Sequence, residues 1–447
     1  MSQRQSAVSA VSENASAGAS ASAASAASAA SAASAASFSA DWLQLREAFD
    51  TAARDAAAPR LAFQELHTLR ELGALGQRQA NAPGSGPGSV SAHSPLRVID
   101  LACGTGANLR WLAPRLGGAQ QWLVVDHDAT LLRRWPACLG LPDGSRTKRL
   151  QYAGTGARSG INASVPTPFS TEIVRRRLDL AQGLESLPWH AAQLVTASAL
   201  LDLVSAAWLQ RLVAAAAAAR VAVLMALNVD GRHRFAPRDA DDATVAALFE
   251  AHQLRDKGFG GPALGAAAGP ALLLALRRAG YSLSHARSDW WLDSGQNMQA
   301  LALQQALVDG MADAAIEQQP AAASVVRAWQ QRRMALSQAH AQTQSKTQSQ
   351  SQSQSQLQSQ LQSQVQAQSQ SQLLSQFLSQ ALSQTQAQTQ TQVKAQLQVQ
   401  VRPQPQPQSQ PQPQPQPQSK SQSQSRRQAG PSTLRVGHVD VLALPPR

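Results

Sequence analysis

From residue 97 onward, short apolar runs alternate with segments in which apolar residues recur at helical spacing. Helices are expected from about Asn108 and around Leu131. Five apolar runs are expected to form strands: RVIDLA (97–102), QWLVVD (121–126), IVRRRLDL (173–180), QLVTAS (193–198) and VAVLMALNV (221–229). This alternation of strand and helix predicts βαβ units and a parallel sheet.

After the fifth apolar run the pattern continues with mixed elements. We expect a polar-faced helix at about 241–255, the glycine-rich loop KGFGGPALG at 257–265, an Ala/Leu-rich helix, and a strand over 281–292. The segment TLRVGHVDVLALP (433–445) also has strand character, although a Gln/Ser tract separates it from the rest. A strand needs a partner, so we predict that the tract is an insertion and that the last strand returns to the sheet.

A helical N-terminal preface is predicted over residues 38–78, ahead of a Gly/Pro/Ser linker at 79–95. Its first helix has Asp41 placed to cap it, and a second helical run follows Pro59. The apolar residues at helical spacing are Trp42, Leu45 and Phe49 in the first helix, and Phe63, Leu66, Leu69 and Leu72 in the second.

Composition divides the chain further. Residues 1–37 hold a Ser/Ala repeat and residues 337–430 are almost entirely Gln, Ser, Thr and Pro, so both tracts are predicted to be disordered for want of large apolar side chains. The segment 141–171 is rich in glycine and poor in apolar residues, and we expect a mobile insertion there. The remaining residues, 96–336 with the returning strand at 431–447, are enough for one large domain.

The formal net charge of +12 raises the question of a nucleic-acid partner, and the location of the charge bears on it. Much of the net positive charge is spread thinly through the C-terminal tract, so the sequence supports such a partner only weakly. The basic residues beyond Ser337 are Lys346, Lys394, Arg402, Lys420, Arg426, Arg427, Arg435 and Arg447, against the single acid Asp440.

The two cysteines, Cys103 and Cys138, are too few for a disulfide framework. Cys103 also lies inside a glycine-rich loop, where a bridge would disrupt the turn. These features predict a reduced, cytoplasmic setting. No stretch approaches the roughly 20 apolar residues of a membrane span, so no membrane partner is expected.

The segment VIDLACGTGAN (98–108) is the strongest chemical motif in the chain. An apolar strand runs through Asp100 into Gly104-Thr105-Gly106 and then into a helix, and glycines allow the backbone to turn sharply and approach a ligand. A second acid, Asp126, ends the next strand and is placed to accept hydrogen bonds from two ribose hydroxyls. A third acid, Asp179, lies at the end of the third strand.

A nicotinamide dinucleotide is the alternative ligand for such a turn. That fingerprint requires a small residue at the third glycine position, where this chain has Leu109, and it does not require an acid at Asp100. A ligand with a cationic amino-acid part does favour an acid at this position. The motif therefore favours such a ligand over a nicotinamide dinucleotide.

In these motifs the chain resembles the class I S-adenosylmethionine (SAM)-dependent methyltransferases, over residues 96 to about 292 and the final strand. The segments WLQLREAFDTAAR, LVTASALLDLVS and AHQLRDKGFGGPALG are similar to a little-studied bacterial group of these enzymes that has no known substrate. The resemblance implies a seven-stranded Rossmann-like α/β sheet, mostly parallel, with an antiparallel last strand inserted between the fifth and sixth.

The resemblance also implies a cofactor site for SAM. Asp100, Gly104 and Gly106 would line the amino-acid end, Asp126 would hold the ribose, and Asp179 with Leu180 would lie beside the adenine. The neighbouring residues expected to complete this site are Ala102, Asn108, His127 and Thr196.

No dedicated catalytic residue follows from the sequence, because positioning supplies much of the catalysis in methyl transfer. The Asn-Pro-Pro-aromatic box of amino-methylating nucleic-acid enzymes is absent after the fourth strand, and the sequence shows no cluster of acids and histidines for a metal. His252 is the candidate general base, although a lone helical histidine is more often satisfied structurally. The acceptor candidates in the loops beyond strands four and five are Asn228, Asp230, Arg232, Arg255 and Lys257.

The sequence therefore predicts a SAM-dependent methyltransferase with a small-molecule acceptor. An RNA or protein methyltransferase that uses its basic tail, and a SAM-binding scaffold without catalysis, remain the alternatives.

Overall fold

The computed structural model describes residues 38–63, 65–66, 95–142, 149–157, 166–394 and 432–446. The chain forms two units, one of residues 1–342 with 430–447 and one of residues 343–429. Four of the predicted segments lie wholly or mostly outside the described residues. They are the N-terminal Ser/Ala repeat, the second preface helix, the 79–95 linker and the part of the Gln/Ser/Pro tract beyond Lys394.

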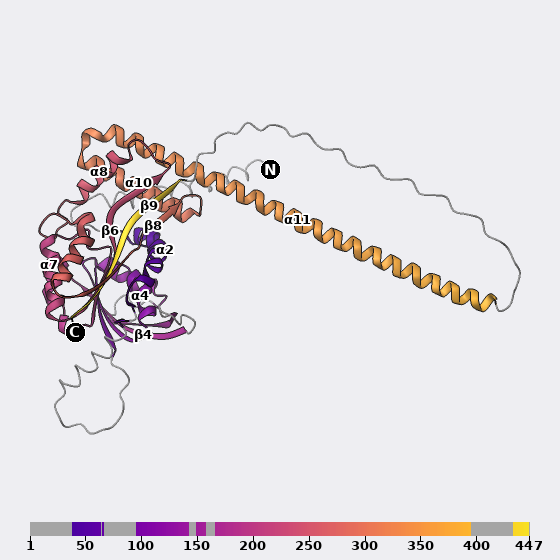
Figure 1. Ribbon diagram of the computed structural model, residues 1–447, viewed down its shortest axis with the longest axis horizontal. Coiled ribbons are helices and arrows are strands. Elements are labelled where there is room, and N and C mark those ends of the chain that lie inside the picture. Colours follow the sequence, from indigo (N-terminus) through magenta and orange to yellow (C-terminus); the bar gives the residue numbers. More distant parts are fainter. Residues whose placement is uncertain are drawn as a thin grey trace, which may run out of the picture. The chain divides into compact units, whose positions relative to one another are not determined.

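The first unit is built on a mixed sheet in the order β3-β4-β2-β1-β5-β6-β9-β7, with β8 paired to β9 (Figure 1). Within the described residues nine strands form this sheet: β1 (Leu96–Leu101), β2 (Gly118–Asp126), β3 (Arg149–Ala157), β4 (Pro166–Arg177), β5 (Leu194–Ser198), β6 (Ala222–Ala236), β7 (Ser282–Arg287), β8 (Trp290–Asp293) and β9 (Thr433–Leu444). This is a Rossmann-like α/β architecture, as the sequence predicted, but its strand count exceeds the expected seven.

The five predicted βαβ strands form the parallel centre of this sheet. β1 pairs in parallel with β2 and β5, β2 pairs with β4, and β5 pairs with β6. Successive residues of β1 face opposite sides, with Val98 in one apolar cluster and Ile99 in another. Because both faces of the strand are buried, its sequence is almost continuously apolar.

Part of the expected mobile insertion is ordered. β3 and residues 166–174 of β4 form an antiparallel pair at the edge of the sheet, so the prediction of a loop is wrong for residues 149–157 and 166–171. The side chains of Leu150 and Phe169 are buried, and the rings of Tyr152 and Phe169 meet edge-on with centroids 5.5 Å apart. These few apolar residues alternate within a polar segment and suffice to cover the sheet edge.

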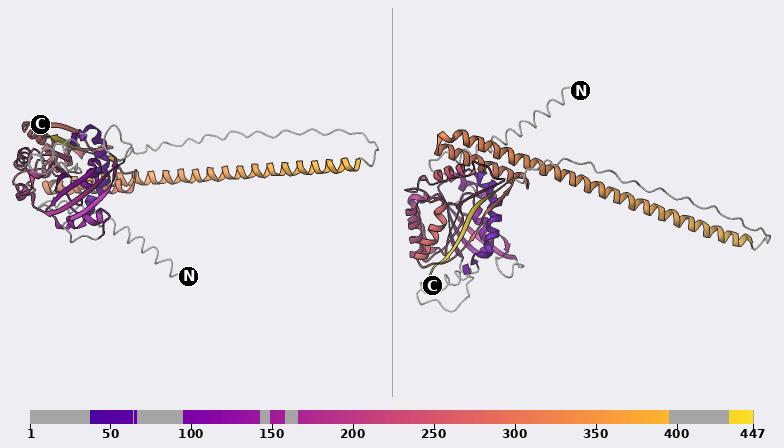
Figure 2. Two further views of the ribbon diagram at one scale, coloured as in Figure 1. Left: turned by 90° about the horizontal axis from the view of Figure 1, so that it is seen from below. Right: turned by 45° about the horizontal axis from the view of Figure 1, so that its top comes forward.

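The last strand returns to the sheet as expected. β9 pairs antiparallel with β6 on one side and with β7 and β8 on the other, and Figure 2 shows it within the sheet of the first unit. The strand predicted over 281–292 is divided into β7 and β8. The break falls at Ser288 and Asp289, whose side chains bond Asp440 and Arg435, both in β9.

Helices cover both faces of the sheet (Figure 1). The α-helices are α2 (Ala40–Ala57), α4 (Ala107–Leu116), α5 (Ala129–Cys138), α6 (Leu180–Gly183), α7 (Ala206–Ala218), α8 (Asp242–Gln253), α9 (Ala268–Arg278), α10 (Met298–Gln318) and α11 (Ala323–Lys394). Trp111 of α4 and Trp135 of α5 pack on one face, whereas Trp208 of α7 and Leu272 of α9 pack on the other. Short 3-10 turns are η1 (Ala58–Arg60), η2 (Leu184–Ser186), η3 (Trp189–Ala191), η4 (Gly265–Ala267) and η5 (Pro320–Ala322).

The preface helix α2 packs against the first unit through its apolar stripe. Trp42, Leu45 and Phe49 contact a third apolar cluster, which includes Trp290 and Trp329. The hydroxyl of Ser39 caps the helix by accepting a hydrogen bond from the amide of Trp42 at 3.1 Å, so the expectation that Asp41 is the cap is wrong. Ser39 holds the position because its backbone is extended just before the helix begins.

Helix α11 continues where disorder was predicted. Residues 337–394 are helical, because the stretch from Ala323 to Lys394 contains neither proline nor glycine to interrupt the backbone. Its first turns belong to the first unit, with Val326 and Trp329 buried. In the second unit every described side chain from residue 343 to residue 383 is exposed. None of the helices within the described ranges is long and apolar enough to cross a bilayer.

Candidate functional site

A cavity of about 400 Å³ lies where the carboxyl ends of β1, β2 and β5 meet. Its walls come from the glycine turn after β1, the start of α6, the preface helix α2 and the loops after β5 and α8. Eight of the predicted cofactor residues line it: Asp100, Ala102, Gly104, Asn108, Asp126, His127, Asp179 and Leu180. Gly106 and Thr196 are not among the lining residues, and both support residues that are.

The glycine turn after β1 is held from behind by α5. Gly104 has φ +51° and Gly106 has φ +91°, so both need the left-handed backbone that glycine adopts freely. A Cβ at Gly106 would lie 3.0 Å from the ring of Trp135. The indole Nε1 of Trp135 donates a hydrogen bond of 2.9 Å to the carbonyl of Gly104. The turn therefore has little room for side chains.

Asp100 lies near the carboxyl end of β1. Its side chain is fully buried and lines the cavity. Its Oδ1 accepts a hydrogen bond of 2.7 Å from Nδ2 of Asn108, whereas its Oδ2 is buried without a hydrogen-bond partner among the described residues. Burial raises the pKa of Asp100 to about 7, and the hydrogen bond from Asn108 and the charge of Arg54 partly oppose that rise. A cationic ligand group at Oδ2 would satisfy the orphaned oxygen and favour the ionised carboxyl.

Asp126 ends β2 with both oxygens aligned by backbone amides. Oδ2 accepts from the amide of Gly104 at 2.8 Å and Oδ1 accepts from the amide of Asp128 at 2.9 Å. Burial raises the pKa of this carboxyl, and the two amides act against the rise. Because each carboxylate oxygen has two lone pairs, each can accept one further bond, as a ligand with two adjacent hydroxyls requires.

The third acid, Asp179, is held at the start of α6. Its carboxylate caps that helix by accepting a hydrogen bond of 2.9 Å from the amide of Ala181. Leu180 is buried and Leu178 also lines the cavity. The amide of Leu178 donates to the carbonyl of Asp126 at 2.9 Å, which ties this wall to the end of β2. This side of the cavity therefore presents the apolar side chains of Leu178 and Leu180 beside a carboxylate.

The preface helix supplies a wall that the sequence did not predict. Phe38 precedes α2, and Leu43, Arg46 and Asp50 come from it. The guanidinium of Arg46 donates to both oxygens of Asp50, at 2.9 and 3.0 Å, and lies 4.7 Å from the centre of the Trp290 ring. In the sequence, the i, i+4 spacing of Arg46 and Asp50 was the indication of an ion pair between them. This spacing does not show that the pair faces the cavity.

Of the predicted acceptor residues, only Lys257 lines the cavity, together with Gly258 and Phe259. Its Nζ donates to the carbonyl of His252 at 3.4 Å, and burial lowers its pKa. It forms no ion pair within 4 Å with a carboxylate of the described residues. Lys257 is thus a cation that is able to pair with an anionic group of a ligand.

The other acceptor candidates have structural partners away from the cavity. The Asn228 amide donates to the carbonyls of Met225 and Val439, at 2.9 and 2.8 Å. Arg232 pairs with Asp230 and with Asp289, and none of Asn228, Asp230 and Arg232 is among the residues that line the cavity.

His252 and Arg255 lie together at the end of α8, near α10. Nε2 of His252 is 3.2 Å from the carboxylate of Glu317, and Arg255 pairs with the same carboxylate. His252 is buried and its pKa is lowered, chiefly by burial. Neither residue is among those lining the cavity, so His252 is not placed to act as a base there.

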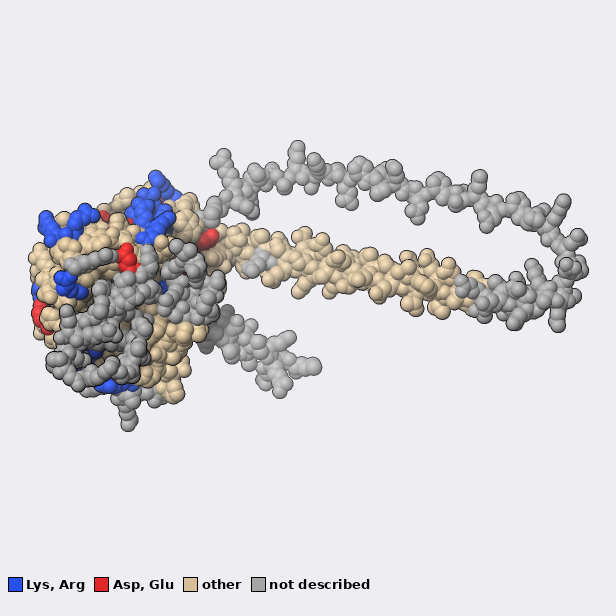
Figure 3. All heavy atoms as spheres, turned by 60° about the horizontal axis from the view of Figure 1, so that its bottom comes forward, with Lys and Arg blue, Asp and Glu red and all other residues tan. Residues whose placement is uncertain are grey.

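Two further predictions concern metals and charge. Within the described ranges, no group of three or more His, Cys, Asp or Glu side chains is arranged to hold a metal ion. Figure 3 shows the basic side chains of the sheet-bearing unit in separate groups, with acidic side chains between them, on the face that it draws.

No model of a known protein family matches the chain, and no curated protein is similar to it in sequence. Among solved structures, it is similar to a geranyl diphosphate methyltransferase in complex with SAM, at 13% identity and a TM-score of 0.27, over 50% of this chain and 72% of that one. A SAM-dependent methyltransferase from Archaeoglobus fulgidus gives 15% identity and a TM-score of 0.23, over 45% and 65% of the two chains. The cyclase SpnF gives 15% and 0.24, over 53% and 70%. Likenesses this distant carry no argument about activity.

Proposed function

We propose that the protein binds SAM in this cavity and transfers its methyl group to a small-molecule acceptor. The observation that carries the proposal is the pair of acids at the ends of adjacent strands. Asp100 offers one buried, unpartnered oxygen, and Asp126 offers two oxygens aligned by amides. An α-ammonium group and a ribose diol are complementary to these two carboxylates.

The residues present fit SAM along the rest of the cavity. The glycine turn between the two acids lets the backbone approach the methionine part, and Leu180 with Leu178 would pack on the adenine. When bound, SAM supplies an electrophilic methyl group on a sulfonium centre. The task of the chain is then to orient the sulfonium and to exclude water, which the apolar side chains of Leu43, Leu131 and Leu203 would do.

The acceptor would occupy the side of the cavity between α2 and the loop after α8. Phe259 offers an apolar contact there and Lys257 a cation, so an acceptor with an apolar body and a negative group fits this side. Arg46 is already neutralised by Asp50. Methyl transfer by in-line displacement depends on such positioning and needs no base when the acceptor atom is already nucleophilic.

A SAM-binding protein without catalysis is the second candidate. It is favoured by the fact that no histidine lines the acceptor side among the described residues.

Two measurements test the proposal. Titration calorimetry of the full-length protein should show binding of SAM and weaker or no binding of NADH, and the reverse order would remove the cofactor assignment. Incubation with methyl-labelled SAM and a metabolite extract should then yield a labelled small molecule. Binding without any turnover across such extracts would leave the scaffold as the function.

A further inference from the structure

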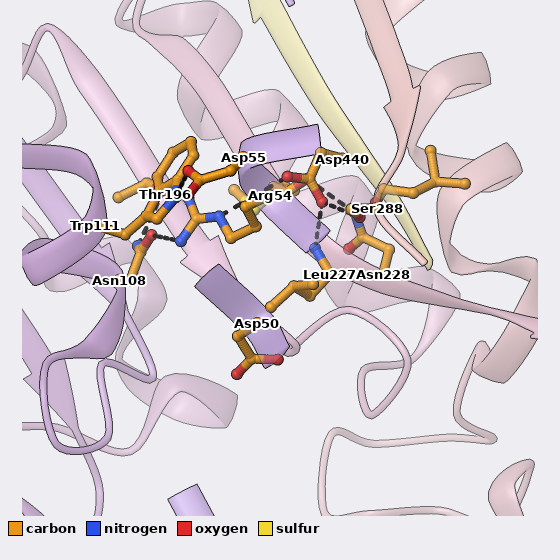
Figure 4. A network of polar contacts seen from close by, with 12 residues as sticks. Asp50, Arg54, Asp55, Asn108, Trp111, Thr196, Leu227, Asn228, Ser288 and Asp440 are labelled. Atoms are coloured by element: carbon orange, nitrogen blue, oxygen red, sulfur yellow. Dashed lines mark hydrogen bonds and ion pairs between the residues drawn. The ribbon is translucent and has the colours of Figure 1, made fainter. Parts of the chain in front are cut away.

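Arg54 of α2 is the buried cation behind the cofactor site (Figure 4). Only 2% of the residue is exposed. Its Nη1 donates a hydrogen bond of 2.9 Å to Oδ1 of Asn108, and its Nε lies 3.8 Å from Oδ2 of Asp440. The guanidinium also stacks on the ring of Trp111 at 3.8 Å. Arg54 therefore joins the preface helix to α4 and to β9.

The contact with Arg54 determines how the side-chain amide of Asn108 is oriented. A guanidinium has donors and no acceptor, so Asn108 must turn its carbonyl oxygen toward Arg54. The amide nitrogen of Asn108 then faces the opposite way, where it donates to Oδ1 of Asp100 at 2.7 Å and to the hydroxyl of Thr196 at 3.1 Å. Without Arg54 the amide could rotate and present its oxygen to the Asp100 carboxylate, which would repel it.

The position of Arg54 depends in turn on the last strand. Asp440 of β9 is fully buried and accepts hydrogen bonds from the amide of Leu227 at 2.8 Å and from the hydroxyl of Ser288. Its other oxygen faces Arg54 and has no hydrogen-bond partner among the described residues. This carboxylate opposes the effect of burial on the Arg54 guanidinium more strongly than Asp50 and Asp100, which act in the same direction.

We propose that Arg54 is a positioning residue for the cofactor site: it holds Asn108 in the one amide orientation that supports an ionised Asp100. Docking of α2 and return of β9 thereby become conditions for binding SAM. The inference rests on the proposed function, because it concerns how Asp100 receives the cationic group of that ligand.

The charge on Arg54 also acts on Asp100 through space. Burial raises the pKa of Asp100 to about 7, and the neighbouring charge of Asp126 adds to the rise, whereas Asn108 and Arg54 lower it. The charge of Asp100 also acts on the buried thiol of Cys103, whose pKa is raised chiefly by burial. Removing Arg54 takes away its charge and the fixed orientation of Asn108, so the pKa of Asp100 rises further. A larger fraction of Asp100 would then be protonated at neutral pH.

The test compares SAM affinity in full-length Arg54→Met and in the parent protein by calorimetry at pH 6, 7, 8 and 9. Because the ionisations of SAM itself are the same for both proteins, the ratio of the two affinities isolates the effect on the site. We expect SAM to bind Arg54→Met about tenfold or more weakly at pH 7. The ratio should shrink toward pH 9, where Asp100 ionises in both proteins.

Arg115→Met is the matched control. Arg115 also stacks on Trp111, at 4.0 Å, and pairs with Asp55 of α2, but no hydrogen bond joins it to Asn108 in the described structure. Its loss should leave SAM affinity at the parent value at every pH. If Arg115→Met reproduces the pH-dependent loss, the effect belongs to the docking of α2 in general and the proposal is wrong.

Other outcomes separate the inference from the function on which it rests. Parent-like affinity in Arg54→Met, or a loss of equal size at every pH, overturns the role of Arg54 alone. A parent protein that does not bind SAM overturns the proposed function as well. If Arg54→Met does not fold, Arg54→Lys decides. This variant keeps the charge but does not reach Asn108, so we expect it to bind SAM more weakly than the parent at pH 7, with a difference that again shrinks toward pH 9. Parent-like affinity of Arg54→Lys would overturn the proposal.

Discussion

The backbone amide of Gly104 donates a hydrogen bond of 2.8 Å to Oδ2 of Asp126, which joins the glycine turn after β1 to the acid that ends β2. The turn and the acid are 22 residues apart in sequence. This bond fixes the carboxylate relative to the turn, so that the two can contact one ligand at once. A change at either residue is expected to affect binding at both.

Asp126→Ala should weaken SAM binding by about 1 to 3 kcal/mol, because hydrogen bonds from a ligand to a charged group are lost. Titration calorimetry measures the change. Asp128→Ala is the control, since Asp128 caps α5 through the amide of Thr130 and does not line the cavity. It should lower stability without changing SAM affinity. Equal affinities of Asp126→Ala and the parent would contradict the assignment of Asp126.

Asp100→Asn should stabilise the SAM-free protein while it weakens SAM binding. The pKa of this buried carboxyl is raised to about 7 in the folded protein, so the unfolded chain releases the proton at lower pH than the folded one. The free energy of unfolding therefore falls by about 1 kcal/mol per pH unit as the pH rises from about 4 to about 7. The neutral amide removes this cost. Urea denaturation of both proteins at pH 5 and pH 8 should show a larger gain at pH 8, and a gain independent of pH would refute the explanation.

Gly106→Ala should destabilise the protein by about 3 kcal/mol, because the substitution combines a strained positive φ with a clash against Trp135. Gly140 also has a positive φ, of +65°, but a Cβ there meets nothing within 4 Å. Gly140→Ala should therefore cost only about 1 kcal/mol. Urea denaturation compares the two variants. Equal losses would show that Trp135 does not confine the turn.

Truncation at Ser337 should abolish soluble folding. It removes β9 and exposes the edges of β6 and β7, together with the apolar side chains that Leu434, Val441 and Leu442 cover. Excision of residues 343–428, with a flexible linker of about 20 residues in their place, should preserve folding because loop-closure entropy changes slowly with length. Soluble yield and cooperative thermal melting distinguish the two proteins. A soluble, SAM-binding protein that ends at Ser337 would disprove the dependence on β9.

Backbone amides of residues 343–383 should exchange with solvent within seconds, although they are helical, because no buried side chain stabilises this part of α11. Amides of β6 and β9, which pair within the sheet, should be protected far longer. Hydrogen-exchange mass spectrometry measures both. Slow exchange in 343–383 would indicate that exposed apolar residues such as Leu361 and Phe377 pack on another helix in solution.

The sequence alone was enough to predict the parallel strands and the glycine turn after β1, because both leave local marks. A strand buried on both faces is apolar throughout, and a turn with positive φ values requires glycines such as Gly104 and Gly106. The acids Asp100 and Asp126 were predicted because each directly follows the apolar residues of its strand. The resemblance to a known family added the antiparallel place of the last strand, which β9 occupies.

Only the tertiary structure decided which residues beyond the motif reach the cavity. Arg46 and Asp50 line it because α2 docks there, and the docking follows from side chains that fit against Trp290 and α4, which no periodicity encodes. The same holds for Arg54, which contacts Asn108 across 54 residues of sequence and Asp440 across the whole domain. Spacing along a chain specifies which side of an element is apolar, whereas the partner of a buried charge depends on which elements meet in space.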